Sequence, residues 1–569
     1  MKFLKKYSPA IFLIITLIIG AFFRFSKLGS SPSGLYVDEA SIGYSAFSVL
    51  KTGKDEYGKT LPILFRSFST FQSPVYTYIT VPFIYLFGLS PFSTRLPSAL
   101  FGTLSIILIY FIAKPLFLES NNNGDTKKIT IDAELFAQFA AFFMAISPWH
   151  IQYSRTAYES NIALFFLLLG SLLFFYALRR PWLFTFSFVF YGISLNSYRA
   201  EILIVPILIF ALIINYKNKI FLQIKNFIPP LISSCLLLLL ITIPVIRVLQ
   251  TPGFRVRSDS MNIFSSNPQN AWGYKTGIDK IFSFTNNPKL LSVKEFFSLY
   301  TSYFSPRYLF FLGDSGPRKA YPSIGTFFSW QLPLLLIGLY VLLKNKNQKS
   351  LRVFIFTLLL VSPIPASLTR DPYSTLRSLP MVVPLLLIIS LGLLYIFQSL
   401  LPLLNKTKYL VLTFIVFLSI LKIYISIFYH HDYFRSVYWN YGWEQAISKL
   451  PNLDPKLPIL VDNSHGDTYI EILFFLKYNP ATYQQDNFEV SASEYYTNLN
   501  RNTTKKIGRF TVKSFQWGVD TDHTNQYIIA DNITIGKVQI KEHNLSVIDE
   551  IYYPNGEIAL RILKTNPKI

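Results

Sequence analysis

The sequence predicts an α-helical polytopic membrane protein that carries a small exterior α/β domain at its C-terminal end. The 569-residue chain is 51% hydrophobic and 17% aromatic, which is too apolar for a soluble enzyme of this length. Its apolar residues are also gathered into blocks. A bilayer core of about 30 Å needs about 20 apolar residues per helix, and about eleven blocks approach that length.

The expected spanning blocks follow one another up to residue 428. They are residues 9–25, 95–118, 133–147, 161–178, 181–195, 200–216, 227–246, 326–343, 353–366, 376–401 and 409–428. A shorter apolar stretch, 74–88, is interrupted by Pro82, so we expect it to lie at the membrane interface.

The basic residues predict the orientation. If the N-terminus is cytoplasmic, most loop lysines and arginines fall on the same side, as the positive-inside rule requires. The formal charge of +22 then follows from topology, and we expect no nucleic-acid partner. We predict a multi-pass protein of the cell membrane whose active site and C-terminal domain face outward. The first block lacks a small-residue cleavage site and is expected to be retained.

Two domains are expected. Residues 1–428 form a transmembrane module with outer loops 26–94 and 247–325, and residues 429–569 form an exterior domain. In that domain, runs 456–462, 526–540 and 551–563 predict strands, 467–480 predicts a helix, and Asn555-Gly556 predicts a hairpin turn. It contains no catalytic motif, so we expect it to serve acceptor choice or stability.

Two adjacent carboxylates, Asp38 and Glu39, follow the first spanning block. Acidic side chains at a membrane boundary cost free energy unless they are hydrated, paired or metal-bound, which makes them candidate functional residues. The alternative is structural, because acids also favour the N-terminus of a helix, here 40–50. A second acidic pair, Asp55 and Glu56, lies between glycines and is expected in a solvated loop.

Further outer turns contribute charged side chains. The turn 147–161 contains His150, Arg155 and Glu159, and the i,i+4 spacing of the last two predicts that they share a helical face. A plain surface salt bridge is the alternative. Later turns supply the remaining candidate cations, which are Arg199, Arg370 and Arg377.

These arginines lie on the predicted outer side, where the positive-inside rule disfavours cations. A guanidinium binds phosphate in bidentate fashion. The arginines therefore predict a phosphate-bearing lipid. One acid can take a proton from an incoming hydroxyl while the arginines stabilise the departing phosphate. Glycosyl transfer from a polyprenyl-phosphate sugar fits this arrangement.

The segments "DEASIGYSAFSVLKTGKDEYGKTLPILF", "FQSPVYTYITVPFIYLFGLSPFSTRLPSALFGTLSIILIYFIAKPLF" and "SPWHIQYSRTAYESNIALFF" resemble the C-type (GT-C) integral-membrane glycosyltransferases. More narrowly, they are similar to glycosyltransferase family 39 and its relatives, the protein O-mannosyltransferase and aminoarabinose-transferase group. "FLGDSGPRKAYPSIGTFFSW" and "TRDPYSTLRSLPMVVPLLL" resemble later outer-loop segments of such enzymes.

The resemblance implies roles for individual residues. Asp38 corresponds to the general base or acceptor-positioning acid, with Glu39 beside it, and Glu159 corresponds to the second acid. Arg199 and Arg377 correspond to the phosphate-binding residues. Gln72 stands where relatives often carry a lysine, so another cation takes that part or the donor is held differently.

The implied partners are the lipid bilayer, a polyprenyl-phosphate sugar donor, and a protein or glycan acceptor. Protein hydroxyl, glycolipid and polysaccharide all remain open as acceptors, and so does a divalent metal ion. A transporter or flippase of a lipid-linked saccharide is the main alternative, and a non-catalytic scaffold is a third. A transporter favours paired repeats, and no half-to-half repeat is seen.

Overall fold

The structure is a computed structural model of the chain. It describes residues 2–68, 70–119, 126–222, 224–249, 251, 262–264, 288–345, 348–370, 372–400, 407–464, 466–487, 494–496 and 504–567. Most of the predicted outer loop 247–325 before residue 288 lies outside the described residues. The chain divides into two compact units. Unit 1 comprises Met1–Ser26, Ser98–Gln250 and Arg255–Ser426, and unit 2 comprises Lys27–Pro97, Thr251–Phe254 and Ile427–Ile569.

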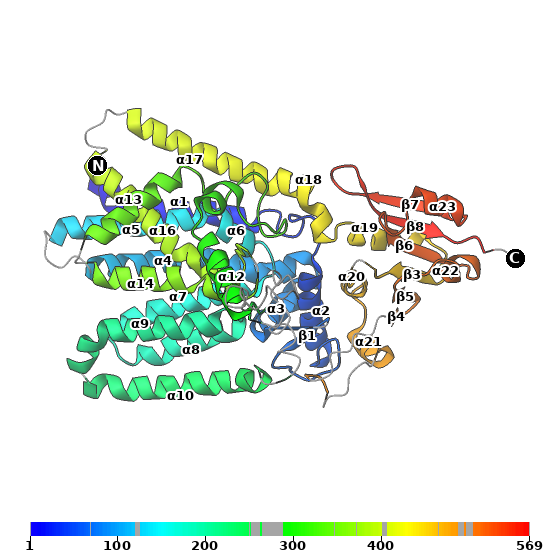
Figure 1. Ribbon diagram of the computed structural model, residues 1–569, viewed down its shortest axis with the longest axis horizontal. Coiled ribbons are helices and arrows are strands. Elements are labelled where there is room, and N and C mark those ends of the chain that lie inside the picture. The colour runs from blue at the N-terminus through cyan, green and yellow to red at the C-terminus, as the bar shows by residue number, and fades with distance from the viewer. Residues whose placement is uncertain are drawn as a thin grey trace, which may run out of the picture. The chain divides into compact units, whose positions relative to one another are not determined.

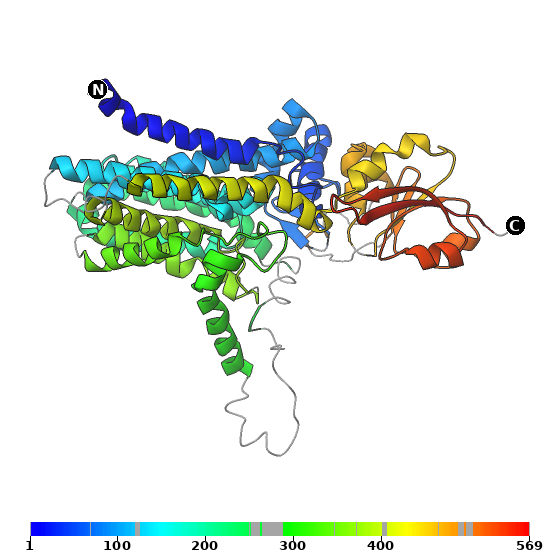
Figure 2. The ribbon, with the colours of Figure 1, turned by 90° about the horizontal axis from the view of Figure 1, so that it is seen from above.

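Unit 1 is helical. Its longer helices are α1 (Lys2–Phe25), α4 (Pro91–Glu119, from Ser98 onward), α5 (Thr126–Ile146), α7 (Glu159–Ala177), α8 (Leu183–Ser197), α9 (Glu201–Leu222), α10 (Ile224–Leu249), α12 (Pro288–Ser302), α13 (Gln331–Lys344), α14 (Lys349–Val361), α16 (Val382–Tyr395) and α17 (Thr407–Ile425). Shorter helical segments are α6 (Pro148–Ser154), α15 (Ile364–Ser367), η2 (Arg307–Leu312), η3 (Leu379–Met381) and η4 (Ile396–Leu400). Figures 1 and 2 show most of the long helices running side by side as a bundle, whereas α12 points away from it in Figure 2.

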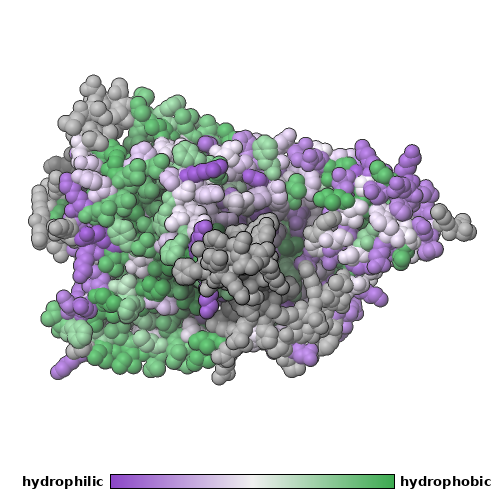
Figure 3. Space-filling view, in the orientation of Figure 1, coloured by the Kyte–Doolittle hydropathy of each residue, from purple (hydrophilic) through white to green (hydrophobic). Residues whose placement is uncertain are grey.

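Each predicted apolar block overlaps one of these helices. Seven described helices are long and apolar enough to cross a membrane, and five further apolar helices have only 10–17 residues. The number of eleven spans therefore stays a prediction, whereas the multi-pass helical architecture is confirmed. Apolar side chains cover much of the surface over the bundle (Figure 3), as a lipid-facing surface requires.

Small residues allow two of the bundle helices to approach closely. A Cβ atom added at Gly338 of α13 would meet the carbonyl of Ile388, and one at Gly392 of α16 would meet the carbonyl of Leu334. Glycine is the residue that lets helix backbones come together in a membrane, where no hydrophobic effect drives them.

Unit 2 joins the first predicted outer loop to the C-terminal segment. The loop contributes α2 (Val37–Thr52), β1 (Phe65–Ser67), β2 (Thr70–Gln72) and α3 (Pro74–Phe87). The C-terminal segment contributes η6 (Ser426–His430, from Ile427), α18 (His431–Arg435), η7 (Ser436–Trp439), α19 (Trp443–Ser448), η8 (Leu450–Asn452), β3 (Ile459–Asp462), α20 (Tyr469–Phe475), α21 (Pro480–Asp486), β4 (Lys505–Ile507), β5 (Phe510–Lys513), α22 (Val519–Asp522), β6 (Tyr527–Asp531), α23 (Lys537–Glu542), β7 (Ser546–Tyr552) and β8 (Ile558–Lys564).

The C-terminal strands form one mixed sheet in the order β4-β5-β3-β6-β8-β7. The central strand β3 pairs in parallel with β5 and β6, with Ile459 opposite Phe510 and Tyr527. The remaining pairs are antiparallel, and β7 and β8 form the predicted hairpin with Gly556 at φ 87°. The sheet and the helix within 467–480 are confirmed.

One strand prediction is wrong in its second half. The run 526–540 begins as β6, but its last residues belong to α23. Asp531 Oδ1 accepts hydrogen bonds from the backbone N–H groups of Ile533 (3.0 Å) and Thr534 (2.7 Å). This local turn ends the strand, because the side chain satisfies backbone donors that would otherwise continue the ladder.

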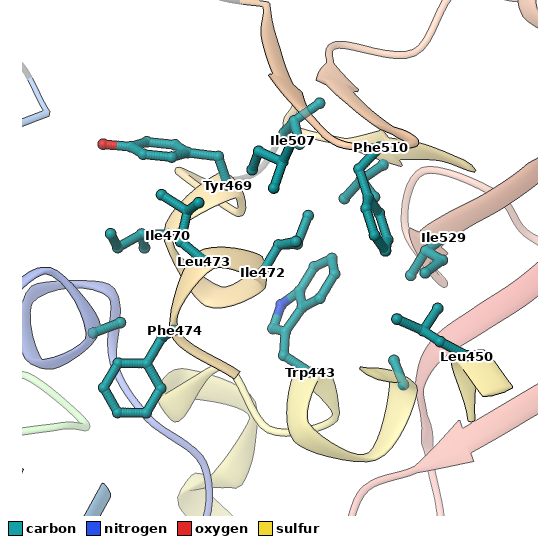
Figure 4. Packing of buried hydrophobic residues seen from close by; sticks show 14 of the residues in the cluster. Trp443, Leu450, Tyr469, Ile470, Ile472, Leu473, Phe474, Ile507, Phe510 and Ile529 are labelled. Carbon is teal, nitrogen blue, oxygen red and sulfur yellow. The ribbon is translucent and has the colours of Figure 1, made fainter. Parts of the chain in front are cut away.

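A shared apolar core explains why the first loop belongs to unit 2 rather than to the helical bundle. Buried loop residues, among them Leu35, Ala40 and Tyr44, pack with residues of α19, α20 and the sheet. Figure 4 shows the C-terminal side of this cluster, including Trp443 and Phe474. The predicted assignment of loop 26–94 to the transmembrane module therefore differs from the packing.

Candidate functional site

The two acids of the first loop lie in the first turn of α2, which begins three residues earlier than predicted. Asp38 is half-buried, whereas Glu39 is fully buried. Glu39 Oε2 accepts a hydrogen bond from the Tyr36 backbone N–H at 3.3 Å, so it caps the helix. Glu39 therefore has the structural role that was the alternative for this pair, an acid at the N-terminus of a helix.

Glu39 also forms a bidentate ion pair with Arg95. The Arg95 Nε atom donates to Oε1 at 3.0 Å and Nη2 donates to Oε2 at 2.8 Å, and both side chains are 0% exposed. Arg95 further donates to three carbonyls of the preceding loop, those of Leu28, Pro32 and Gly34. One guanidinium thus fastens residues 28–39 and fixes where α2 starts, and with it the position of Asp38.

Gln72 ends the short strand β2 and is half-buried. It pairs with Phe65 of β1 in a two-stranded antiparallel sheet, directly before α3. The backbone register of β1 and β2 therefore fixes the position of Gln72 directly before α3.

The second acidic pair of the first loop is buried, so the predicted solvated loop is wrong. Asp55 is 0% exposed and Glu56 is 1% exposed. The Tyr495 hydroxyl donates to Asp55 Oδ2, and Tyr469 donates to Glu56 Oε1 at 3.4 Å. The prediction failed for a physical reason. Residues 469 and 495 cover this turn, and they are so far from it along the chain that no local sequence pattern indicates the contact.

Burial changes the protonation of this cluster. It raises the pKa of Asp55 to about 6 and, with help from the Asp55 charge, that of Glu56 to about 8. Burial also lowers the pKa of Lys505 to about 8, against the opposing attraction of Glu56. A carboxyl whose pKa is raised on folding stabilises the folded state less as pH rises from its unfolded pKa to its folded pKa.

We therefore expect wild-type unit 2 to lose stability between pH 6 and pH 8, where Glu56 has released its proton in the unfolded chain but largely keeps it in the folded state. Replacement by an uncharged amide, Glu56→Gln, should remove a loss on the order of 2 kcal/mol over these two pH units. Unfolding midpoints at pH 6 and pH 8 measure it. Glu444→Gln, an exposed change in the same unit, is the control. Equal pH dependence in wild type and Glu56→Gln would contradict the assignment.

In unit 1, the turn 147–161 contains the short helix α6, which Ser147 caps by accepting from the His150 backbone N–H. The His150 ring is fully buried, and Arg24 Nη2 lies 2.7 Å from its Nδ1. Burial, followed by the Arg24 charge, lowers the pKa of His150 well below its usual value. Because arginine only donates, Nδ1 is the acceptor and the ring proton lies on Nε2.

The predicted shared helical face of Arg155 and Glu159 is wrong. Arg155 is the C-cap of α6, whereas Glu159 is the first residue of α7. The chain leaves the helix between them, so an i,i+4 relation does not apply. Arg155 is fully buried and its Nη1 donates to the Phe23 carbonyl at 2.7 Å, while Glu159 is half-buried.

A hydrogen-bonded network joins α6 to two later segments of unit 1. Asp314 Oδ2 accepts from the backbone N–H of Thr375 at 2.7 Å and from its hydroxyl at 2.6 Å, and Asp314 Oδ1 accepts from the Gly316 N–H at 2.7 Å. The Thr375 hydroxyl lies 2.6 Å from the Tyr153 hydroxyl. Trp149 Nε1 donates to the Thr375 carbonyl at 3.0 Å. Segments 147–158, 313–326 and 372–379 therefore meet in unit 1.

This network carries basic side chains. Arg377 is half-buried and lies two residues after Thr375, while Arg318 and Lys319 follow Asp314. Gln152 of α6 holds the Arg318 carbonyl at 2.8 Å. Burial lowers the pKa of the Arg318 guanidinium, which stays a cation at neutral pH.

The other two predicted cations lie elsewhere in unit 1. Arg199 is half-buried, next to Tyr198, which is close enough to Tyr153 to influence its titration. Arg370 contacts Glu295, with 3.6 Å between Nε and Oε1, and donates to the Ile263 carbonyl at 3.3 Å. Arg370 is thereby held by α12, whereas Arg377 lies beside the network.

Sequence reasoning missed Asp314, Arg318 and Lys319. Their segment resembles a later outer-loop segment of the glycosyltransferases, but charged residues among glycine and proline are also typical of a solvated loop. Among the described residues, no three His, Cys, Asp or Glu side chains are grouped as metal ligands.

Residues 72–123 match the family described as dolichyl-phosphate-mannose-protein mannosyltransferase. The resemblance to the family 39 group is confirmed. In Bacillus subtilis (strain 168), "Putative mannosyltransferase YkcB" is 34% identical over 134 residues and "Putative mannosyltransferase YycA" is 31% identical over 128 residues. These matches cover 23% and 22% of this chain and span 16% of the length of either relative.

Two solved structures are similar in outline. The Archaeoglobus fulgidus oligosaccharyltransferase in the apo form aligns over 98% of this chain and 75% of its own, with 14% identity and a TM-score of 0.47. ArnT from Cupriavidus metallidurans bound to undecaprenyl phosphate aligns over 98% and 99%, with 12% identity and a TM-score of 0.45. At this level of identity the likeness concerns the fold alone.

Proposed function

We propose that the chain is a glycosyltransferase that moves a sugar from a polyprenyl-phosphate-linked donor to an acceptor on the outer face of the membrane. The observation that carries the proposal is the network of Asp314, Thr375 and Tyr153. It holds cationic segments together at the ends of apolar helices, where a lipid phosphate needs them. The family match of residues 72–123 supports the same reaction class.

The chemistry assigns roles to the acids. Asp38, half-buried at the start of α2, takes the proton of the attacking hydroxyl. Glu39 positions Asp38 through the Arg95 ion pair and does not touch substrate, because both its oxygens are engaged. Glu159 opens α7 beside α6 and is the second acid of the site.

The basic residues stabilise the phosphate as it leaves. Arg377 and Arg199 bind it. The resemblance implies a lysine at the position of Gln72, and Arg318 and Lys319 supply that positive charge in its place. Guanidinium groups at a partly dehydrated site are suited to this, since they bind phosphate oxygens in pairs and keep their charge. Arg370, held by Glu295, anchors its segment.

The experiment uses the purified chain in nanodiscs with labelled polyprenyl-phosphate sugars. A glycosyltransferase releases polyprenyl phosphate and consumes the sugar linkage. A transporter or flippase of the same lipid moves the intact donor between leaflets and releases none. Intact donor throughout, with movement between leaflets in liposomes, would replace the proposal by that alternative. Repeating the assay with EDTA shows whether a divalent ion takes part.

Truncation of the phosphate contacts should affect turnover more than folding. Arg377→Gln and Arg199→Gln should each cost a few kcal/mol of transition-state stabilisation, because each removes a charged partner of the leaving group. Donor affinity and turnover should fall together, since the interaction strengthens as the phosphate departs. Lys344→Gln at the end of α13 is the control cation. An arginine variant that keeps both parameters unchanged is an ordinary interfacial anchor.

A further inference from the structure

Glu201 is a buried carboxylate that none of the contacts above explains. It is the first residue of α9 and is 1% exposed. Within the described part of the chain, neither of its carboxylate oxygens has a hydrogen-bond partner. A buried acidic group without partners is costly, so ionisable residues in such places mark functional sites by default.

The helix topology places Glu201 at the end of the bundle that carries the network. Helix α7 begins at Glu159, α8 packs against it, and α9 begins four residues after α8 ends. The Ser194 hydroxyl near the end of α8 donates to the Ala163 carbonyl near the start of α7 at 2.9 Å. The start of α9 therefore lies at the same end as the start of α7 (Figure 1).

The connection from α8 to α9 also leads to α6. The Glu201 backbone N–H donates to the Tyr198 carbonyl at 3.1 Å. Tyr198 in turn is close enough to Tyr153 to raise the pKa of its phenol, although burial is the larger cause. Since Tyr153 contacts Thr375, Glu201 belongs to the same region as the proposed phosphate contacts.

Other polar atoms of this region are buried without hydrogen-bond partners among the described residues. They are His150 Nε2, Gln152 Oε1, Ser160 Oγ and Asn161 Oδ1. The set combines an N–H donor with several acceptors, as a ligand with many hydroxyl groups requires. A phosphate offers only acceptors, so it would leave the acceptor atoms of this set without donors.

We infer that Glu201 accepts hydrogen bonds from hydroxyl groups of the transferred sugar and so determines which sugar is used. The inference rests on the proposed function and adds the sugar-recognising residue to it. The two oxygen atoms without partners among the described residues match two neighbouring hydroxyls. A site built to bind a hydroxyl rejects an analogue that lacks it, because the buried carboxylate is then left unpaired.

The test compares wild type with Glu201→Gln, which keeps the shape of the side chain. The probes are short-chain polyprenyl phosphates carrying mannose, glucose, galactose or 4-aminoarabinose, and polyprenyl phosphate without a sugar. For the preferred sugar we expect kcat/KM of Glu201→Gln to fall about 10- to 100-fold. Binding of sugar-free polyprenyl phosphate should stay as in wild type. Glu134→Gln, which changes a carboxylate already paired with Lys114 at 2.6 Å, should leave the ranking of sugars unchanged.

Deoxy analogues of the preferred donor provide a second measurement on wild-type protein, independent of how the variant folds. With the donor that lacks the contacted hydroxyl, kcat/KM of the wild type should fall by the same factor. For Glu201→Gln, kcat/KM should be only slightly lower with that analogue than with the full donor. Unchanged kcat/KM and sugar ranking in a folded Glu201→Gln, or equal losses with the deoxy donor in both proteins, would overturn the inference alone. A wild type that turns over none of the donors would overturn the proposed function and this inference with it.

Discussion

Asp38→Asn should abolish sugar transfer while the protein remains folded and inserted. The amide keeps the shape of the side chain but cannot accept the proton of the attacking hydroxyl. General-base catalysis contributes about 10²- to 10⁴-fold, so turnover should fall by at least about 100-fold. The measurement is release of polyprenyl phosphate from a labelled donor.

The matched control for Asp38→Asn is Asp522→Asn. Asp522 is another half-buried aspartate of unit 2, on α22. The Asp522→Asn protein should transfer sugar at the wild-type rate. Unfolding temperatures equal to that of the wild type would show that the loss of transfer does not come from a loss of stability. Wild-type turnover by Asp38→Asn would remove this residue from the mechanism.

Breaking the Glu39–Arg95 pair should produce the largest loss of stability. Glu39→Gln leaves a fully buried guanidinium without its carboxylate, and removal of one partner from such a pair costs about 3–5 kcal/mol. Because Arg95 still holds the carbonyls of residues 28, 32 and 34, the disturbance should centre on the start of α2. Transfer should then fall as well, through the displaced Asp38.

The comparison pair is Lys449 and Asp549, which lie 2.5 Å apart but are 37% and 35% exposed. Asp549→Asn should cost less than about 1 kcal/mol, because water screens that pair. The double change Glu39→Gln with Arg95→Met should lose less than the sum of the single changes. Thermal unfolding in detergent measures all of them. A Glu39→Gln protein as stable as the wild type would show that the pair does not fix α2.

Periodicity and composition predicted the helical bundle because a lipid-facing helix needs one long apolar run and nothing else. The same local logic found the Asn555-Gly556 hairpin. It could not show that α2 packs against α20 and α21, since contacts between residues 40 and 470 leave no local pattern. Truncation after residue 428 would therefore also remove the partners of the helix that carries Asp38.

The candidate site was predicted in part for the same reason. Charged residues near apolar blocks could be listed from sequence, but their partners could not. Glu39 and Glu56 look alike as members of acidic pairs, yet Glu39 is held by Arg95. Glu56 lies beside Tyr469, and its Oε2 has no hydrogen-bond partner in the described part of the chain. Asp314 was overlooked because its partner, Thr375, is 61 residues away.

The most direct measurement is an experimental structure of the chain with a non-hydrolysable polyprenyl-phosphate sugar bound. The proposed function predicts the phosphate within about 4 Å of the guanidinium of Arg377 or Arg199. The inference on Glu201 further predicts sugar hydroxyls against its carboxyl group. A phosphate bound away from segments 147–158, 313–326 and 372–379, with none of these cations in contact, would contradict the proposed function.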